Sequence, residues 1–300
     1  MSGAPLIGVD WGTSNLRACL FGADGAVLER RGSDQGIQRI ETGGHEAVLS
    51  DLVDGWLPAG ERPRILMCGM IGSRQGWREA PYAPCPAGLA EIAAALIPVD
   101  TAWADVWIAP GLSTLAADHR ADVMRGEETQ ILGLAPEGGE ALVIAPGTHS
   151  KWAEVNAGRV SSFRTYLTGE LYELLSRHSI LARLMEGDAP DAACFALGAE
   201  RALAAPGLLG LLFSVRAEAL FHHLPATGLA AYLSGLLIGS EVAEGLAAAD
   251  PNVPILIAAA PRLGELYRTV LDLAGRPAAH IIDGGEASAL GLWRIWEART

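Results

Sequence analysis

Two short loops in the sequence combine glycine with hydroxyl side chains, and each follows an apolar run. The first is Gly12-Thr13-Ser14-Asn15, and the second is Gly147-Thr148-His149-Ser150. Glycine lets the backbone approach a ligand closely, and the hydroxyls add donors beside successive backbone N–H groups. The pattern predicts two phosphate-binding loops. Arg17 and Lys151 follow on the outgoing segments, where each either reaches a polyphosphate or lies on a solvated edge.

The two loops differ in the residue that ends the preceding apolar run. This residue is Asp10 before the first loop and Ala145 before the second. Phosphate repels a carboxylate unless a cation lies between them, so Asp10 is predicted to hold Mg²⁺ through water. The alternative is an aspartate that caps its own glycine turn.

The loops occupy the same place in a repeated series of predicted elements: strand, loop, strand, glycine-containing hairpin turn, strand. The predicted strands are residues 6–9, 16–21 and 26–29 in the first copy, and 141–144, 151–155 and 159–164 in the second. Agreement over five elements favours a duplication over two unrelated hairpins. No Walker-type or Rossmann-type glycine fingerprint is present, which disfavours those two classes of nucleotide-binding fold.

Strands and helices alternate along the rest of the chain, which predicts an α/β fold with mixed sheets. Further strands are predicted at residues 65–68, 106–109, 255–259 and 280–282, and the longer predicted helices include 124–134, 208–223 and 229–248. The turn-rich stretch Pro136-Glu137-Gly138-Gly139 predicts a boundary between an N-terminal lobe, residues 1–136, and a C-terminal lobe, residues 137–300.

The composition limits the classes of partner. A formal net charge of −13 repels nucleic acids and anionic membranes, so neither is an expected partner. The apolar stretch 229–249 contains Glu241 and Glu244, and we therefore expect a buried helix rather than a membrane span. Four dispersed cysteines without a CxxC pair, and no signal-like segment before the first strand, predict a cytoplasmic protein. A homo-oligomer is compatible with the sequence.

Several segments resemble known families. Asp10-Trp11-Gly12-Thr13-Ser14-Asn15-Leu16-Arg17 resembles the first phosphate motif of the actin-like ATPase superfamily. The chain from residue 6 to at least 245 is similar to the 2-dehydro-3-deoxygalactonokinase family. The segments that carry this similarity are Gly69-Met70-Ile71-Gly72-Ser73, Gly76-Trp77, Ala80-Pro81-Tyr82, Met124-Arg125-Gly126-Glu127-Glu128-Thr129-Gln130, Pro146-Gly147-Thr148-His149-Ser150-Lys151-Trp152, Phe163-Arg164-Thr165 and Thr168-Gly169-Glu170-Leu171.

This resemblance implies two ribonuclease H-like lobes, the duplicated actin-like ATPase fold, with an interdomain cleft. It also implies ATP, Mg²⁺ and phosphorylation of the terminal C6 hydroxyl of 2-dehydro-3-deoxy-D-galactonate. The N-terminal lobe would hold the sugar-acid loop, and the C-terminal lobe a helical insertion and the adenosine-binding region. Ala259 and Ala260 stand where the adenosine motif of the superfamily usually has two glycines.

Phosphoryl transfer needs a group that accepts the proton of the hydroxyl. Glu127 and Glu128 lie just before or within a predicted helix, and the resemblance implies that this helix lines the cleft and often supplies the base. Adjacent helical residues point to different faces, so only one of them faces the cleft. We favour Glu128 as the base. The alternative is an acidic first turn stabilised by the helix dipole.

A sugar acid needs cationic donors and an aromatic wall. The segment 72–82 offers Arg74, Trp77 and Tyr82, although it is also compatible with a surface loop whose tryptophan packs into its own lobe. The other candidate substrate contacts, in the similar segments, are Arg125, Arg164, Thr168 and Glu170. His149 either orients a phosphate or is a loop histidine with its own partner.

Three alternatives to this function remain open on the sequence. A kinase of a different sugar acid would share every motif. An exopolyphosphatase-like phosphohydrolase would share the lobes and the Gly126-Glu127-Glu128 element, but the chain lacks a basic polyphosphate track. An actin-like filament protein would not need the Arg/Trp/Tyr loop.

Overall fold

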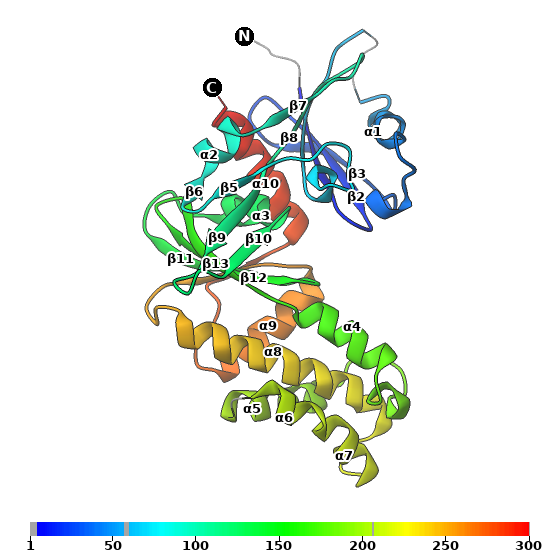
Figure 1. The fold of residues 1–300 in the computed structure, drawn as a ribbon, viewed down its shortest axis with the longest axis vertical. Coiled ribbons are helices and arrows are strands. Elements are labelled where there is room, and N and C mark those ends of the chain that lie inside the picture. The colour runs from blue at the N-terminus through cyan, green and yellow to red at the C-terminus, as the bar shows by residue number, and fades with distance from the viewer. Residues whose placement is uncertain (1–4, 57–59, 206, 300) are drawn as a thin grey trace. The chain divides into compact units, whose positions relative to one another are not determined.

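A computed structural model of the chain describes residues 5–56, 60–205 and 207–299 (Figure 1). Within these residues the chain forms two compact units. Unit 1 comprises Met1–Val143, Ala153–Phe163 and Asp283–Thr300, and unit 2 comprises Ile144–Trp152 and Arg164–Ile282. The chain thus passes from one unit to the other several times, and the C-terminal helix belongs to unit 1. The predicted division into lobes at 136–137 stays a prediction.

The main sheet of unit 1 has six strands in the order β3-β2-β1-β4-β8-β7. Their bounds are β1 (Leu6–Trp11), β2 (Leu16–Phe21), β3 (Val27–Ser33), β4 (Arg64–Cys68), β7 (Ile97–Val99) and β8 (Asp105–Ile108). β1 pairs antiparallel with β2, with Asp10 opposite Arg17, and parallel with β4, with Asp10 opposite Cys68. Because parallel strands end at the same edge, the residues that follow β1 and β4 lie close together.

The core of unit 1 forms on this sheet because its central strands are apolar. Ile7, Val9 and Trp11 of β1 are fully buried, and they share one cluster with Ile65 of β4 and Leu49 of α1 (His45–Val53). Two short 3₁₀ helices, η1 (Ile37–Arg39) and η2 (Met70–Gly72), adjoin the ends of the strands. A second sheet of unit 1 has the order β10-β9-β5, with β5 (Tyr82–Pro84), β9 (Gly111–Leu115) and β10 (Ala121–Met124).

Two helices of unit 1 pack at very close range. α3 (Glu127–Leu134) contacts α10 (Gly284–Glu297), as Figure 1 shows. A Cβ on Gly291 would lie 1.9 Å from the carbonyl oxygen of Thr129, and one on Gly133 would lie 2.3 Å from that of Ala287. Only glycine permits this approach, which fixes α3 and its first-turn carboxylates against α10. The remaining helix of this region is α2 (Leu89–Ala94).

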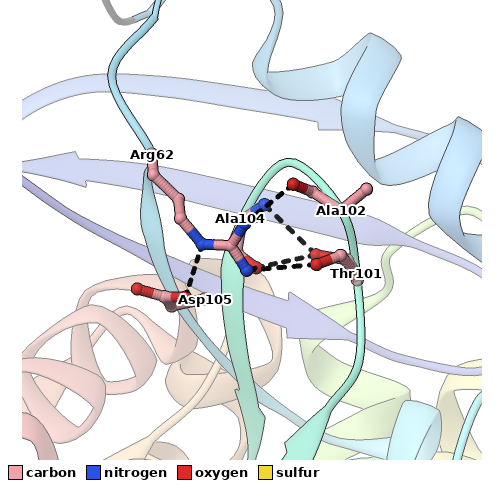
Figure 2. Close-up of polar contacts among 5 residues, drawn as sticks. All are labelled: Arg62, Thr101, Ala102, Ala104 and Asp105. Carbon is pink, nitrogen blue, oxygen red and sulfur yellow. Dashed lines mark hydrogen bonds and ion pairs between the residues drawn. The ribbon is translucent and has the colours of Figure 1, made fainter.

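Arg62 joins the segment before β4 to the connection between β7 and β8 (Figure 2). Its guanidinium donates to the carbonyl oxygens of Thr101 at 3.1 Å, Ala102 at 2.7 Å and Ala104 at 2.8 Å, and to Oδ1 of Asp105 at 2.6 Å. Arginine suits this position because its planar fork offers five donors in fixed directions. One side chain therefore supplies hydrogen-bond donors to the converging carbonyl groups of this turn.

The third sheet has the order β15-β14-β11-β12-β13-β6, and β11, β12 and β13 each have residues in both units. The bounds are β6 (Ala87–Gly88), β11 (Glu140–Ala145), β12 (Ser150–Asn156), β13 (Arg159–Tyr166), β14 (Ile255–Ala258) and β15 (His280–Ile282). β11, β12 and β13 are the second copy of the predicted repeat, and β1, β2 and β3 are the first.

Helices form most of unit 2. They are α4 (Thr168–His178), η3 (Ala182–Leu184), α5 (Ala192–Ala204), α6 (Leu208–Leu212), α7 (Ser214–Leu220), η4 (Ala226–Gly228), α8 (Leu229–Ala248) and α9 (Pro261–Leu273). α5 and α8 run side by side (Figure 1), and the cluster around α8 buries Tyr232, Leu233 and Leu236 completely. By length and composition the helical stretch Ala226–Ala248 could cross a membrane, but 67% of its most apolar window is buried inside the protein. The predicted buried helix is thus confirmed as a core element.

The structure contains every predicted strand and corrects two of the helices. The predicted helix 124–134 begins only at Glu127, because Gly126 has φ of 107° and Met124 belongs to β10. The predicted helix 208–223 is two short helices, α6 and α7. Strands β5, β6, β7, β9 and β10 were not predicted, since two to five residues leave too short a pattern.

Candidate active site

The first predicted phosphate loop lies in unit 1, directly after β1. The N–H group of Gly12 donates to the carbonyl oxygen of Asn15 at 2.9 Å, which closes the turn. The Gly12 carbonyl oxygen accepts from the Ile37 N–H at 3.1 Å, and the Thr13 carbonyl oxygen accepts from the Gln38 N–H at 3.3 Å. Backbone hydrogen bonds from η1 therefore stabilise the loop. Ser14 and Asn15 are exposed, as is Arg17. Their side chains are therefore accessible to a ligand.

Asp10 is held beside this loop by the C-terminal helix. The Ser288 hydroxyl donates to Oδ2 of Asp10 at 2.9 Å. Burial raises the pKa of Asp10, and the Ser288 hydrogen bond and the Arg17 charge oppose the shift. A Cβ on Gly69, whose φ is 92°, would lie 3.4 Å from Oδ1 of Asp10 and 2.8 Å from the carbonyl oxygen of Trp11. Glycine at this position thus keeps room beside the carboxylate.

This arrangement fits Mg²⁺, which takes oxygen ligands and usually keeps several waters, with one or two carboxylates and substrate phosphates as the remaining ligands. Across the described ranges, no group of three or more His, Cys, Asp or Glu side chains could hold a metal ion by itself. A single carboxylate beside a phosphate loop supplies only part of a ligand set, so a metal ion here would also need water and phosphate oxygens.

Glu128 is the most strongly perturbed carboxyl group in this region. Its side chain is fully buried at the start of α3, where Oε2 accepts from the Gly126 N–H at 2.6 Å and Oε1 from the Thr129 hydroxyl at 3.0 Å. Burial, followed by the charge of Glu127, raises its pKa to about 8. The charges of Asp10 and Glu128 also both raise the pKa of the buried Cys68 thiol, after burial itself, so the two carboxylates lie near the same sulfur atom.

Glu127 has a different environment, as expected for the neighbouring residue of a helix. It is half-buried, and its Oε2 accepts from the backbone N–H of Arg125 at 3.2 Å. Of the two candidate bases, only Glu128 is fully buried.

Of the four predicted substrate contacts in unit 1, the structure brings Arg125 and Tyr82 together. The Arg125 guanidinium lies 4.4 Å from the centre of the Tyr82 ring, and its Nη2 donates to the Ala80 carbonyl oxygen at 2.7 Å. The Nε and Nη1 atoms of Arg125 are buried without a partner. Two unsatisfied guanidinium nitrogens against an aromatic ring are a suitable start for a carboxylate site.

The other two predicted substrate contacts in unit 1, Arg74 and Trp77, have different surroundings. The Arg74 side chain is 86% exposed and pairs with Glu79 at 3.0 Å. Trp77 packs against the core of unit 1 and stacks on the buried His45 ring with 6.1 Å between the ring centres. Trp77 therefore packs into its own unit, which is the alternative that the sequence left open.

The second predicted phosphate loop lies in unit 2 against the start of α4. The Glu170 N–H donates to the Thr148 carbonyl oxygen at 3.0 Å, and a Cβ on Gly169 would lie 2.4 Å from the carbonyl oxygen of Gly147. His149 Nε2 and Glu170 Oε2 are 2.5 Å apart at an exposed position. The histidine therefore has its own partner, which was one of the two interpretations left open.

Ser150 and Lys151, the last two predicted residues of the second loop, are buried. Ser150 donates to the buried carboxylate of Glu241 on α8 at 2.6 Å, and the Lys151 ammonium donates to the His149 carbonyl oxygen at 3.3 Å. The Ser150 hydroxyl is thus directed into the protein. Glu241 was not a predicted site residue, although an acidic residue inside a long apolar run was a visible signal.

A pocket of about 650 Å³ in unit 2 adjoins the second loop. Its wall is mainly apolar and contains residues of α4, α5, α8 and α9. The lining residues that bear on the predictions are Gly147, Thr148, Thr168 and Ala260. Two other predicted residues, Ala259 and Arg164, are not in the lining. Ala259 is buried, and Arg164 pairs with Glu244 at 3.2 Å. Arg262, Tyr172 and Asp188 add polar groups to the lining. Burial raises the pKa of Tyr172, the charge of Asp188 adds to the shift, and the charge of Arg262 opposes it.

Comparison with known proteins decides the family. The family model described as 2-keto-3-deoxy-galactonokinase matches residues 10–295. The chain belongs to this family. This kinase is 42% identical over 293 residues to a probable 2-dehydro-3-deoxygalactonokinase of Rhizobium meliloti (strain 1021), covering 95% of this chain and 94% of the relative. It is 40% identical over 241 residues to the 2-dehydro-3-deoxygalactonokinase of Escherichia coli (strain K12), covering 80% of each chain.

Of two solved structures that align with the chain, the first agrees with this membership and the second shows the fold alone. A structure from Sinorhizobium meliloti that carries the name 2-dehydro-3-deoxygalactonokinase aligns over 98% of both chains with a TM-score of 0.89 and 39% identity. The (R)-2-hydroxyglutaryl-CoA dehydratase component A of Acidaminococcus fermentans aligns over 99% of this chain and 100% of its own, with a TM-score of 0.53 and 10% identity. The predicted family, the actin-like ATPase fold class and the class of activity, a phosphotransferase, are confirmed.

Proposed function

We propose that this kinase transfers the γ-phosphoryl group of ATP to the C6 hydroxyl of 2-dehydro-3-deoxy-D-galactonate, giving 2-dehydro-3-deoxy-6-phosphogalactonate. The match of the family model over residues 10–295 carries the proposal. Relatives at 40% and 42% identity bear the name of this activity. The match favours a kinase over an exopolyphosphatase-like phosphohydrolase.

The pocket of unit 2 is the proposed nucleotide site. Its volume of about 650 Å³ is within the range of pockets that enclose small ligands, and such pockets are mostly apolar with a few polar groups. Gly147 and Thr148 lie in its lining, so a nucleotide in this pocket would have the second loop beside its phosphates. Ala260 is a small residue that leaves room for a ribose or a base.

Mg²⁺ is the proposed metal, with Asp10 as its protein anchor through water. When bound, the ion would neutralise charge on the phosphate oxygens. Ser288 orients the Asp10 carboxylate through the bond to Oδ2. Thr13, Ser14 and Asn15 would contribute hydroxyl, amide and backbone donors to the phosphates.

Glu128 is the proposed general base for the C6 hydroxyl. A carboxyl group whose pKa is near 8 takes up and releases a proton near neutral pH, which is the property a base needs. Glu128 is fully buried and its Oε2 accepts from the Gly126 N–H, so a hydroxyl would reach it only after a local rearrangement. A Cβ on Gly126 would lie 3.2 Å from the Cα of Gly69, which places these two glycines in contact.

The remaining roles concern the acceptor and the surroundings of the enzyme. Arg125 is the proposed donor to the sugar-acid carboxylate, with Tyr82 as its aromatic support. Arg74, Trp77, Arg164, Thr168 and Glu170 stay predictions as substrate contacts. A cytoplasmic location, the absence of nucleic-acid and membrane partners, and a possible homo-oligomeric state are expectations from the sequence.

A coupled ADP-release assay over a panel of 2-keto-3-deoxy sugar acids tests the proposal. We expect turnover with the galactonate isomer, dependence on Mg²⁺, and no ATP consumption without a sugar acid. Turnover with another isomer alone would refute the substrate but not the kinase class. ATP consumption in the absence of any sugar acid would instead indicate a phosphohydrolase.

A further inference from the structure

The buried carboxylate of Glu241 receives hydrogen bonds from several separate elements of unit 2. Its Oε1 accepts from the Ser150 hydroxyl of β12 at 2.6 Å and from Trp152 Nε1 of the same strand at 2.7 Å. Its Oε2 accepts from the Tyr267 hydroxyl of α9 at 2.7 Å. The Thr168 hydroxyl at the start of α4 also bonds to this carboxylate. One side chain of α8 therefore connects three other elements.

Oε1 of Glu241 accepts from Trp152, because an indole N–H can only donate, and three hydroxyl groups also bond to the carboxyl group. Burial raises the pKa of Glu241, and these four hydrogen bonds oppose the shift. The Glu241 residue is 3% exposed. A buried charge is tolerated when several donors converge on it, and the charged acceptor makes each of these bonds stronger than a neutral one.

Helix α8 has a glycine at the point where the Trp152 ring packs against it. Gly245 follows Glu241 by four residues and so lies on the same face of the helix, one turn further along. A Cβ on Gly245 would lie 2.5 Å from the Trp152 ring. The Trp152 ring thus packs directly against Gly245 while its Nε1 donates to Glu241, and these two contacts define the position of β12 along α8.

Three of the four elements joined by Glu241, namely α4, α8 and α9, border the pocket. Thr168 and Tyr267 line it directly. Ser150 comes directly after Gly147-Thr148-His149, and its bond fixes the end of the second loop where β12 begins. We infer that Glu241 is a positioning residue that holds the second phosphate loop and two walls of the pocket in the geometry that binds nucleotide. This inference rests on the proposed assignment of the pocket to ATP.

Glu241→Gln is the sharpest test, because it keeps the shape of the side chain and replaces one acceptor oxygen by a donor group. At least one hydroxyl that donates to the carboxylate would then have to accept from the amide, and the charge that strengthens these bonds would be lost. With Glu241→Gln we expect the Kd for ADP and the KM for ATP to rise about tenfold, while the KM for the sugar acid changes less than about twofold. The matched control is Glu200→Gln, the same change at an exposed position of α5.

Isothermal titration with ADP measures the effect without the sugar acid, and circular dichroism establishes folding. If Glu241→Gln does not fold, Tyr267→Phe takes its place, since it removes one hydroxyl and keeps the ring; we expect about a threefold rise in the Kd for ADP. A folded variant that binds ADP like the wild type would overturn the inference. So would an equal rise of both KM values. A wild-type protein that binds no ADP would refute the nucleotide assignment itself.

Discussion

At the scale of single residues, burial separates the chemistry of two adjacent carboxyl groups. Glu127 and Glu128 share the first turn of α3, but only Glu128 is fully buried. Its pKa is raised from the ordinary value of 4.5 to about 8. The folded protein therefore binds this proton more tightly than the unfolded chain does. The stability that Glu128 contributes is complete below pH 4.5 and is lost as the pH rises through about 8.

The variant Glu128→Gln tests the role of Glu128 in catalysis separately from its effect on stability. Glutamine can accept from the Gly126 N–H and donate to the Thr129 hydroxyl oxygen, so the local hydrogen bonds survive. We expect kcat to fall by about 10²- to 10⁴-fold, because the base is lost. The melting temperature at pH 9 should equal or exceed that of the wild type, because no buried carboxylate has to ionise. Steady-state kinetics and thermal melts at pH 6 and pH 9 measure both effects.

The neighbouring carboxyl group provides the control. Glu127→Gln should leave kcat within a few-fold of the wild type, and the wild-type kcat/KM should rise with pH up to about 8 as Glu128 ionises. A large loss of kcat in Glu127→Gln with little change in Glu128→Gln would assign the base to Glu127 instead.

At the scale of residues, the sequence indicated the type of chemistry more readily than the contacts between side chains. Gly12-Thr13 and Gly147-Thr148 were recognisable because turn chemistry is local. The role of Ser150 was not, since its hydroxyl bonds to Glu241, 91 residues away in the sequence. Arg74 and Trp77 are close in sequence, yet one is exposed in solvent and the other packs on the core, and only tertiary packing makes that distinction.

At the scale of elements, one arginine holds a connection that has no helix or strand of its own. Arg62 donates to three carbonyl groups and one carboxylate of residues 101–105 (Figure 2). Arg62→Met keeps much of the side-chain length but leaves these acceptors without their donor. We expect the free energy of unfolding to fall by about 1–3 kcal/mol, with kcat unchanged.

Arg120→Met is the matched variant for this measurement. The Arg120 guanidinium pairs with Asp118, two residues away and exposed, so the same substitution should cost less than about 1 kcal/mol. Chemical denaturation followed by fluorescence compares the two. Equal losses in the two variants would show that the bonds of Arg62 to the backbone add nothing to stability.

The elements themselves were predictable where their pattern was long or repeated. The strand–loop–hairpin series appeared twice in the sequence and appears twice in the structure, as β1–β3 and β11–β13. The start of α3 was placed too early because Gly126, with φ of 107°, separates the end of β10 from the helix. A Cβ on Gly126 would lie 3.2 Å from the Cα of Gly69, a contact between segments far apart in the chain that local sequence does not encode.

At the scale of the whole molecule, the residues that line the proposed nucleotide pocket all belong to unit 2. ADP without sugar acid should therefore slow amide hydrogen exchange in α4, α8 and α9, and leave residues 101–105 of unit 1 unchanged. A ligand at 100 times its Kd stabilises the state that binds it by about 2.7 kcal/mol, enough to lower exchange through local opening roughly 100-fold. Ser234→Trp, which places a large ring in the pocket lining, should abolish the protection. Protection confined to the first loop, residues 12–15, would move the nucleotide site to unit 1, and unchanged protection in Ser234→Trp would exclude this pocket.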